Sequence, residues 1–168
     1  MTTEQHFLHS AFREKLIEHL FVAELLKISW KRSDCLLEIA KPEVDTRGYD
    51  LIAEHEELVR HVQLKTTHSL ARASGQNVHV ALAKKPSGCV IWIVFDSETL
   101  QLGPFLFYGG PAGAPLPNMT DMKFAKHTKA DMQGVKAVRK DLRRVPKARF
   151  KRVENIDDLF EVLFSEPV

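Results

Sequence analysis

The sequence has little cysteine and no long hydrophobic run, and both shortages exclude classes of protein. Its 168 residues include only Cys35 and Cys89, without a Cys-x-x-Cys pair, so neither a zinc cluster nor a disulfide framework is indicated. The longest apolar stretches, CVIWIVF and GPFLFYGG, have the length of a strand and not of a membrane span. The N-terminal residues lack the basic and apolar segments of a secretory signal. We therefore expect a cytoplasmic protein with no membrane partner.

Several common catalytic motifs are missing as well. The eight histidines form no His-Glu-x-x-His pattern, which argues against a zinc enzyme of that type. The loop GGPAGAPLPN is rich in glycine and proline but lacks the Gly-Lys-Ser/Thr ending of a phosphate-binding loop. No serine lies in a nucleophile-elbow context. Any chemistry must therefore come from another arrangement of residues.

The basic residues are concentrated near the C-terminal end of the chain. Half of the 24 lysines and arginines lie between Lys123 and Arg152, together with two acids, Asp131 and Asp141. That segment therefore has a net charge of +10, and the rest of the chain, with twelve bases and twenty acids, has −8. Such a separation of charge is typical of a protein with a polyanionic partner, but a solvated basic loop explains it equally well.

Helical periodicity predicts one long helix from Thr3 to about Lys31, with Thr3 as its N-terminal cap. No glycine or proline interrupts this segment. The predicted core-facing side of the helix comprises Phe12, Leu16, Ile17, Leu20, Phe21, Ala23 and Ile28. A second helix is predicted over residues 155–164, because Asn155 is a good cap and two aspartates suit the first turn.

Segments rich in β-branched and aromatic residues predict a sheet between these helices. The predicted strands are residues 35–40, 49–55, 58–67, 78–84, 89–95, 100–110 and 149–153. Residues 89–95 are nearly all apolar, as in a strand buried on both faces. Two stretches stay open: SLARASGQN is a helical turn or a loop, and VKAVRKDLRRVP is a short helix or an irregular arm. The order of elements predicts a single α/β or α+β domain, residues 1–168, around one sheet.

Three polar residues stand out in the strands predicted at 49–55 and 58–67. Strand alternation puts Gln63 and Lys65 on one face, and a short turn would bring Asp50 alongside them. Carboxylate and amide oxygens are suitable ligands for Mg²⁺, and a nearby lysine can orient or deprotonate an attacking water. The alternative is that Gln63 and Lys65 are solvent-facing residues of an edge strand, where lysine is common.

The segments GYDLIAE and HVQLKTT resemble the PD-(D/E)XK nuclease superfamily, which has the restriction-endonuclease-like fold. In that family an Asp at the start of the second strand is followed, on the third strand, by Glu, Asp or Gln, then any residue, then Lys. Asp50 matches the first element, and Gln63-Leu64-Lys65 matches the second in its Gln variant. The resemblance covers roughly residues 7–96, and the basic segment and terminal helix (residues 121–166) follow it. It implies an α/β fold with a long N-terminal helix, a central mixed sheet flanked by helices, and a second helix after the third strand.

Many members of the family also have a Glu on the first helix that faces the site, and two residues compete for that position here. Glu18 fits by its distance from the end of the helix. Glu24 fits because a carboxylate on the apolar face needs a partner or a metal. The resemblance implies that Asp50 and Gln63 bind Mg²⁺ or Mn²⁺, helped by one of these glutamates, while Lys65 serves the attacking water.

The resemblance implies metal-dependent hydrolysis of phosphodiester bonds in nucleic acid, with DNA expected before RNA. The basic residues expected to bind its phosphates are Arg139, Lys140, Arg143, Arg144 and Lys147. Alternatively, the fold is kept without the chemistry and binds nucleic acid or a protein, because Gln63 removes one negative charge from the metal site. A homodimer would supply two sites for cutting both strands, although no residue of the sequence indicates one.

Overall fold

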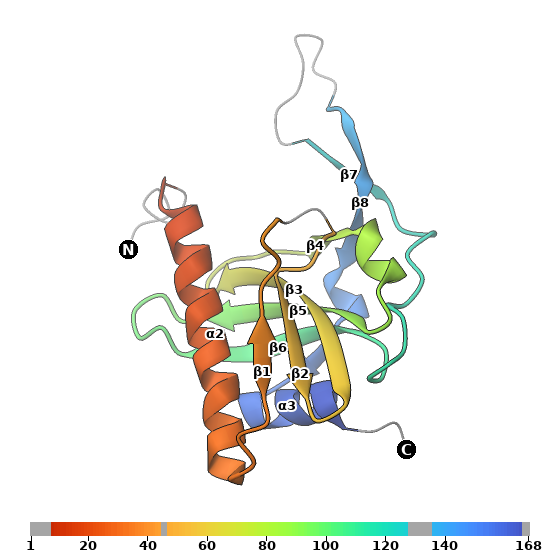
Figure 1. Ribbon diagram of the computed structural model, residues 1–168. Helices are drawn as coiled ribbons and strands as arrows, with labels where there is room; N and C mark the ends of the chain where they lie inside the picture. Colours follow the sequence, from red (N-terminus) through yellow and green to blue (C-terminus); the bar gives the residue numbers. More distant parts are fainter. Residues whose placement is uncertain (1–7, 45–46, 128–135, 166–168) are drawn as a thin grey trace.

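A computed structural model describes residues 8–44, 47–127 and 136–165 of the chain, which has an α/β architecture (Figure 1). Its helices are α2 (Ser10–Arg32), α3 (Ile156–Phe164) and two 3₁₀ turns, η1 (Val80–Lys84) and η2 (Lys147–Arg149). Its strands are β1 (Glu38–Ala40), β2 (Leu51–His55), β3 (Leu58–His68), β4 (Gly75–His79), β5 (Gly88–Phe95), β6 (Leu102–Gly109), β7 (Phe124–Lys126), β8 (Val138–Pro146) and β9 (Lys151–Val153).

The strands form two sheets and the molecule has three layers. A mixed six-stranded sheet has the order β1-β2-β3-β5-β6-β9, in which only β3 and β5 are parallel, and a three-stranded sheet has the order β4-β8-β7. One buried cluster joins α2 and α3 to one face of the large sheet, and a second joins the small sheet to its other face. Both helices therefore cover the same face of the large sheet, and the small sheet, not a helix, covers the other.

Strand β5 lies at the centre of the large sheet and contributes to both clusters. Cys89, Ile91 and Ile93 point towards the helices, whereas Val90 and Trp92 point towards the small sheet. This confirms the prediction of a strand buried on both faces, because a layer on each side removes apolar side chains from water.

The connection from β3 to the parallel strand β5 differs from the expectation in two ways. Residues 69–87 contain β4 and η1 and no α-helix, and β4 pairs with β8 instead of forming a hairpin with β5. The stretch predicted as a strand at 78–84 is mostly the turn η1, which starts where the His79 ring accepts a hydrogen bond from the Ala81 amide at 3.1 Å. The second helix implied by the family resemblance is therefore not found here.

Strand β8 covers the stretch predicted as a short helix or an irregular arm, and both predictions are wrong. It pairs on one side with β4 and on the other with β7, and Leu142 and Val145 are buried. Arginines and lysines occupy most other positions of the strand, and their charge hides the apolar pattern from sequence reasoning. The pairing of three strands, and not local propensity, stabilises it.

Helix α2 ends within one residue of the prediction, whereas the cap predicted at Thr3 lies outside the described residues. Its core face is formed by Ile17, Phe21, Leu25 and Ile28, all buried. The prediction that Phe12 and Ala23 belong to this face is wrong: both are exposed, and 74% of Phe12 is accessible to solvent. The helix therefore has apolar side chains on two opposite sides. Among the described residues, no helix is long and apolar enough to cross a membrane.

The C-terminal helix α3 is confirmed, with its cap. The Asn155 side-chain oxygen accepts a hydrogen bond from the Asp158 amide at 2.8 Å, as the sequence predicts. At the other end, the buried Arg60 of β3 donates hydrogen bonds to the carbonyls of Leu163 at 2.8 Å and Val162 at 3.1 Å. These carbonyls would otherwise lack partners at the helix end, so Arg60 attaches α3 to the sheet.

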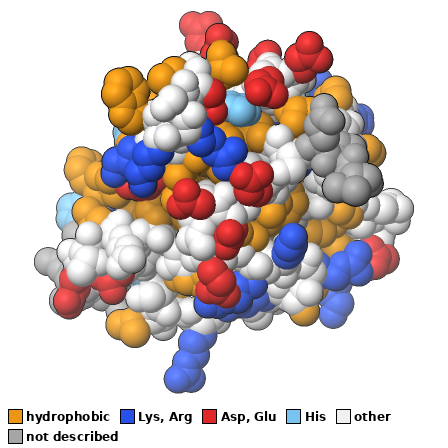
Figure 2. Space-filling model, turned by 90° about the horizontal axis from the view of Figure 1, so that it is seen from below, with side chains coloured by type: hydrophobic (Ala, Val, Ile, Leu, Met, Phe, Trp, Pro, Cys, Tyr) orange, Lys and Arg blue, Asp and Glu red, His pale blue; other side chains and the backbone are white. Residues whose placement is uncertain are grey.

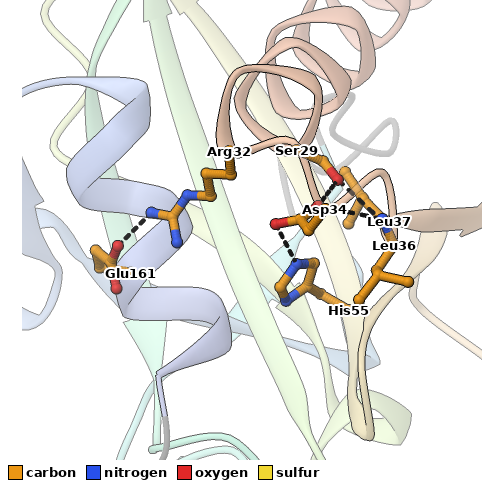
Figure 3. A network of polar contacts seen from close by, with 7 residues as sticks. All are labelled: Ser29, Arg32, Asp34, Leu36, Leu37, His55 and Glu161. Carbon is orange, nitrogen blue, oxygen red and sulfur yellow. Dashed lines mark hydrogen bonds and ion pairs between the residues drawn. The ribbon is translucent and has the colours of Figure 1, made fainter.

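A second polar network joins the ends of α2 and α3 (Figure 3). Asp34, just after α2, accepts hydrogen bonds from the Ser29 hydroxyl and the Leu36 amide and contacts the His55 ring at 3.2 Å. The Ser29 hydrogen bond is the main cause that holds the pKa of Asp34 below its ordinary value. Beside it, Arg32 pairs with Glu161 of α3. Figure 2 shows this lower end of the molecule, where acidic, basic and hydrophobic side chains alternate.

Candidate functional site

Asp50 lies where β2 and β3 begin to separate. Its amide still donates to the Val62 carbonyl at 2.8 Å, as in a regular ladder. One oxygen of its carboxylate then accepts a hydrogen bond from the Leu64 amide at 2.6 Å. The Asp50 side chain thus accepts the hydrogen bond that the residue before it would accept if β2 continued. It is held beside the middle of β3. This is the position that strand pairing predicted for Asp50.

Asp50 and Lys65 line one pocket of about 560 Å³, together with Glu18 of α2. The pocket lies between the N-terminal half of α2, the separated ends of β2 and β3, and the first part of β4. Its other lining residues are Ala11, Glu14, Lys15, Leu64, Thr66, Gln76 and Asn77. Residues from α2, β3, β4 and the position just before β2 therefore place three carboxylates and two amines around the same space.

Glu18 is buried, and two lysines neutralise the charge of its carboxylate. Its carboxylate pairs with Lys15, one turn earlier on the helix, at 3.0 Å and with Lys41 at 2.5 Å. Burial raises the pKa of Glu18, but the hydrogen bonds and charges of Lys41 and Lys15 outweigh burial and hold the pKa below its ordinary value. Glu18 is therefore a carboxylate that stays ionised at the wall of the pocket.

Glu24, the other helix carboxylate, does not line this pocket. It is partly exposed and pairs with Lys27 at 2.8 Å. Nearly two turns of helix separate it from Glu18, and the side chain belongs to a different part of the helix surface. Of the two glutamates that the sequence left open, only Glu18 lies with Asp50 and Lys65.

Gln63 faces the small sheet; strand alternation predicts only that Gln63 and Lys65 share one face of β3. It is buried, and its side-chain oxygen accepts a hydrogen bond from the His79 amide of β4 at 3.3 Å. It does not line the pocket that contains Asp50 and Lys65. His79 in turn packs against Gly48, whose φ of +74° suits glycine. Gln63 therefore contributes to the attachment of β4 behind the pocket.

The five predicted phosphate-binding residues belong to β8 and the turn that follows it. Strands β7 and β8 form what we call the basic hairpin (described residues 123–127 and 136–147), which extends beyond the body of the molecule in Figure 1. Arg139, Lys140 and Lys147 are exposed, whereas Arg143 and Arg144 are half-buried. The Arg143 guanidinium lies over the Phe124 ring at 3.7 Å, which restricts its orientation.

The basic hairpin and the pocket share strand β4. Gln76 and Asn77 line the pocket, and in the antiparallel ladder they lie opposite Val145 and Arg144 of β8. His79, at the end of β4, approaches Asp141 of β8 at 3.7 Å. Because neighbouring strands are about 5 Å apart, the basic residues of β8 begin next to the pocket.

The carboxylates at the pocket suit a Mg²⁺ site that is completed by water and substrate, and not a site enclosed by protein ligands alone. Among the described residues, no three His, Cys, Asp or Glu side chains lie close enough together to enclose a metal ion. Mg²⁺, however, commonly binds one or two carboxylates and completes its shell with water and substrate phosphates. The carboxylates of Asp50 and Glu18 on the pocket wall fit that mode, although Glu18 already has two lysine partners.

Sequence reasoning missed part of the pocket. Lys15 could have been found, because lysine three residues before Glu18 lies on the same side of a helix. Gln76 and Asn77 gave no local signal: they reach the pocket only because of how β4 is positioned. Lys41 gave none either, because its pairing with Glu18 depends on where β1 ends. No protein-family model, curated protein or solved structure matches this chain. The likeness to the PD-(D/E)XK nucleases therefore stays a prediction from the motif.

Proposed function

We propose that this protein is a metal-dependent nuclease that hydrolyses phosphodiester bonds in DNA or RNA, with its active site at the pocket of Glu18, Asp50 and Lys65. The observation that carries the proposal is that these three side chains, from three elements, line one pocket. The basic hairpin next to it supports a polyanionic substrate.

Each group has a chemical role in this proposal. Asp50 would bind Mg²⁺ or Mn²⁺, with Glu18 as a further ligand. The Gln63 amide oxygen is not included, because it accepts a hydrogen bond from the His79 amide and does not line the pocket. When bound, such a cation neutralises charge on the phosphate and lowers the pKa of water. Lys65 would orient the attacking water and stabilise negative charge that develops on the phosphate. Arg139, Lys140, Arg143, Arg144 and Lys147 would bind the flanking phosphates.

The test is a cleavage assay on single- and double-stranded DNA and RNA, with Mg²⁺, Mn²⁺ or EDTA. We expect cleavage that requires the metal and falls by at least about 100-fold in Asp50→Asn and in Lys65→Ala. Glu24→Gln is the matched control, because Glu24 is a helix carboxylate paired with a lysine away from the pocket. Cleavage that persists in both pocket variants would place the activity elsewhere.

A second candidate function is a binding module that has lost catalysis. Two observations favour it: Glu18 is paired with two lysines, and an amide, Gln63, stands where many relatives in the resembled family have an acid. Such a module would bind nucleic acid without cutting it. Its affinity would be unchanged by Asp50→Asn and reduced by loss of the arginines of β8, so the same variants separate the two functions.

A further inference from the structure

The outer side of helix α2 carries a second apolar stripe. Its members are Phe12, Leu16, His19, Ala23, Leu26 and Trp30, and the intervals between them alternate between four and three residues. This is the spacing of the seam along which two helices pack in a coiled coil. The core-facing residues Ile17, Phe21, Leu25 and Ile28 lie on the opposite side of the helix, so the stripe is not part of the core.

The stripe is unusually exposed for residues of this kind. Trp30 and Phe12, near its two ends, are 75% and 74% exposed, and Leu26 is 45% exposed. In Figure 1, α2 lies at the margin of the molecule, with the large sheet on its inner side. Large apolar side chains that gather on one exposed surface usually mark an interaction site.

We propose that this stripe is a homodimer interface in which the α2 helices of two copies pack antiparallel. A two-fold axis near residue 21 makes the stripe self-complementary, as a two-fold interface requires. Phe12 then meets Trp30 of the second copy, and Leu16 meets Leu26. The antiparallel arrangement also separates the basic ends of the two helices, where Lys31 and Arg32 lie, whereas a parallel one would bring them together.

A hollow next to the stripe can accept a side chain of the second copy. It has a volume of about 470 Å³, and its lining includes Ala23, Leu26, Trp30, Cys35 and Leu37. The antiparallel arrangement brings Phe12 of the second copy to this end of α2. An aromatic side chain in an apolar hollow is the usual anchor of a protein interface.

The exposed apolar area approaches that of a specific interface. Aromatic side chains bury roughly 150–250 Å² each, so the four three-quarters-exposed rings of two copies supply on the order of 600 Å². Leu26 and two further exposed leucines, Leu8 and Leu36, lie on or beside the same helix and enlarge this area. The total approaches the roughly 1,000 Å² that a specific interface requires. This inference does not depend on the proposed nuclease function.

Sedimentation of the full chain over a range of concentrations tests the proposal. We expect the wild type to be a dimer, and Phe12→Lys and Trp30→Glu to raise its dissociation constant by at least about 30-fold. Leu70→Glu is the control, since Leu70 is 83% exposed and lies outside α2. Circular dichroism of all variants should match the wild type because the changed side chains are exposed. A monomeric wild type, or equal weakening by Leu70→Glu, overturns the proposal.

Mixing the two single variants tests the orientation. In an antiparallel pair, the lysine introduced in one variant meets the glutamate introduced in the other at one end of the interface. At the other end, the native Trp30 of the first variant meets the native Phe12 of the second. An equimolar mixture of Phe12→Lys and Trp30→Glu should therefore recover the dimer, although each variant alone dissociates. A parallel pair offers no such match, so absence of recovery in the mixture overturns the antiparallel interface.

Discussion

Asn77 and Arg144 lie opposite each other on the antiparallel strands β4 and β8. Asn77 lines the pocket that contains Asp50 and Lys65, and Arg144 belongs to the basic hairpin. The pairing therefore joins two features that the sequence showed only separately, a short polar motif and a distant run of basic residues. A phosphate chain bound along β8 would pass beside the pocket, which is the geometry that a nuclease or a nucleic-acid-binding module needs.

The salt dependence of binding should report on this hairpin. Replacing Arg143 and Arg144 with glutamine should weaken binding to DNA of any sequence and reduce the slope of log affinity against log salt by about 2. Lys27→Gln with Lys31→Gln removes the same charge from α2 and should leave the slope unchanged. Fluorescence anisotropy at several salt concentrations measures both. A slope that is the same for the two double variants would contradict binding at the hairpin.

Gly48 should be intolerant of a side chain. Its φ is +74°, and a Cβ there would lie 2.3 Å from the His79 Cβ, so Gly48→Ala should cost about 2 kcal/mol or more in the free energy of unfolding. Gly113 is the matched control, because its φ is +80° but an added Cβ meets no atom within 4 Å. Gly113→Ala should cost only about 1 kcal/mol. Denaturant titration measures the free energy of unfolding of both variants, and the difference between their losses is the cost of the clash with His79. Equal losses would exclude such a clash.

Arg60 should contribute far more to the free energy of unfolding than a surface arginine does. It is inaccessible to solvent, and besides the end of α3 it donates to the Gly110 carbonyl at 3.0 Å. Arg60→Met should lower the free energy of unfolding by about 3 kcal/mol, because it leaves buried carbonyls without donors. Arg152→Met, which removes an exposed pair with Glu154, should cost far less, because water screens an exposed ion pair. Thermal unfolding distinguishes the two, and similar losses would show that the carbonyls find other partners.

His61 should make stability depend on pH. Burial, and then the nearby charge of Lys85, lower the pKa of His61 below its ordinary 6.5. The folded state therefore resists protonation, so the contribution of His61 to stability is complete above pH 6.5 and is lost as the pH falls below it. His61→Gln should flatten the decline in unfolding free energy between about pH 7 and pH 5. An unchanged slope would mean that other groups cause the decline.

Local signals in the sequence were sufficient to predict several elements of the structure. The alternation of β3 predicted that Gln63 and Lys65 share one face, because a strand reverses its side chains at every step. The Asn155 cap and the doubly buried β5 were predicted for similarly local reasons. The approach of Asp50 to β3 followed from the short turn between β2 and β3, which leaves the chain few alternatives.

Other features required contacts between distant residues. Nothing near Glu18 or Glu24 shows which of them lines the pocket, since that depends on how α2 is rotated and shifted against the sheet. Phe12 belongs to an apolar helix by its spacing, but only the sheet decides that it faces outwards.

The sequence by itself determined the capped helix, the central strand and the polar motif, because each depends on neighbours a few residues apart. Only the tertiary structure decided that β4 pairs with β8, a strand far along the chain, and that this pairing brings basic residues next to the pocket of Asp50 and Lys65. Such pairing is selected by the burial of both sheets in one core, and a local pattern does not encode it.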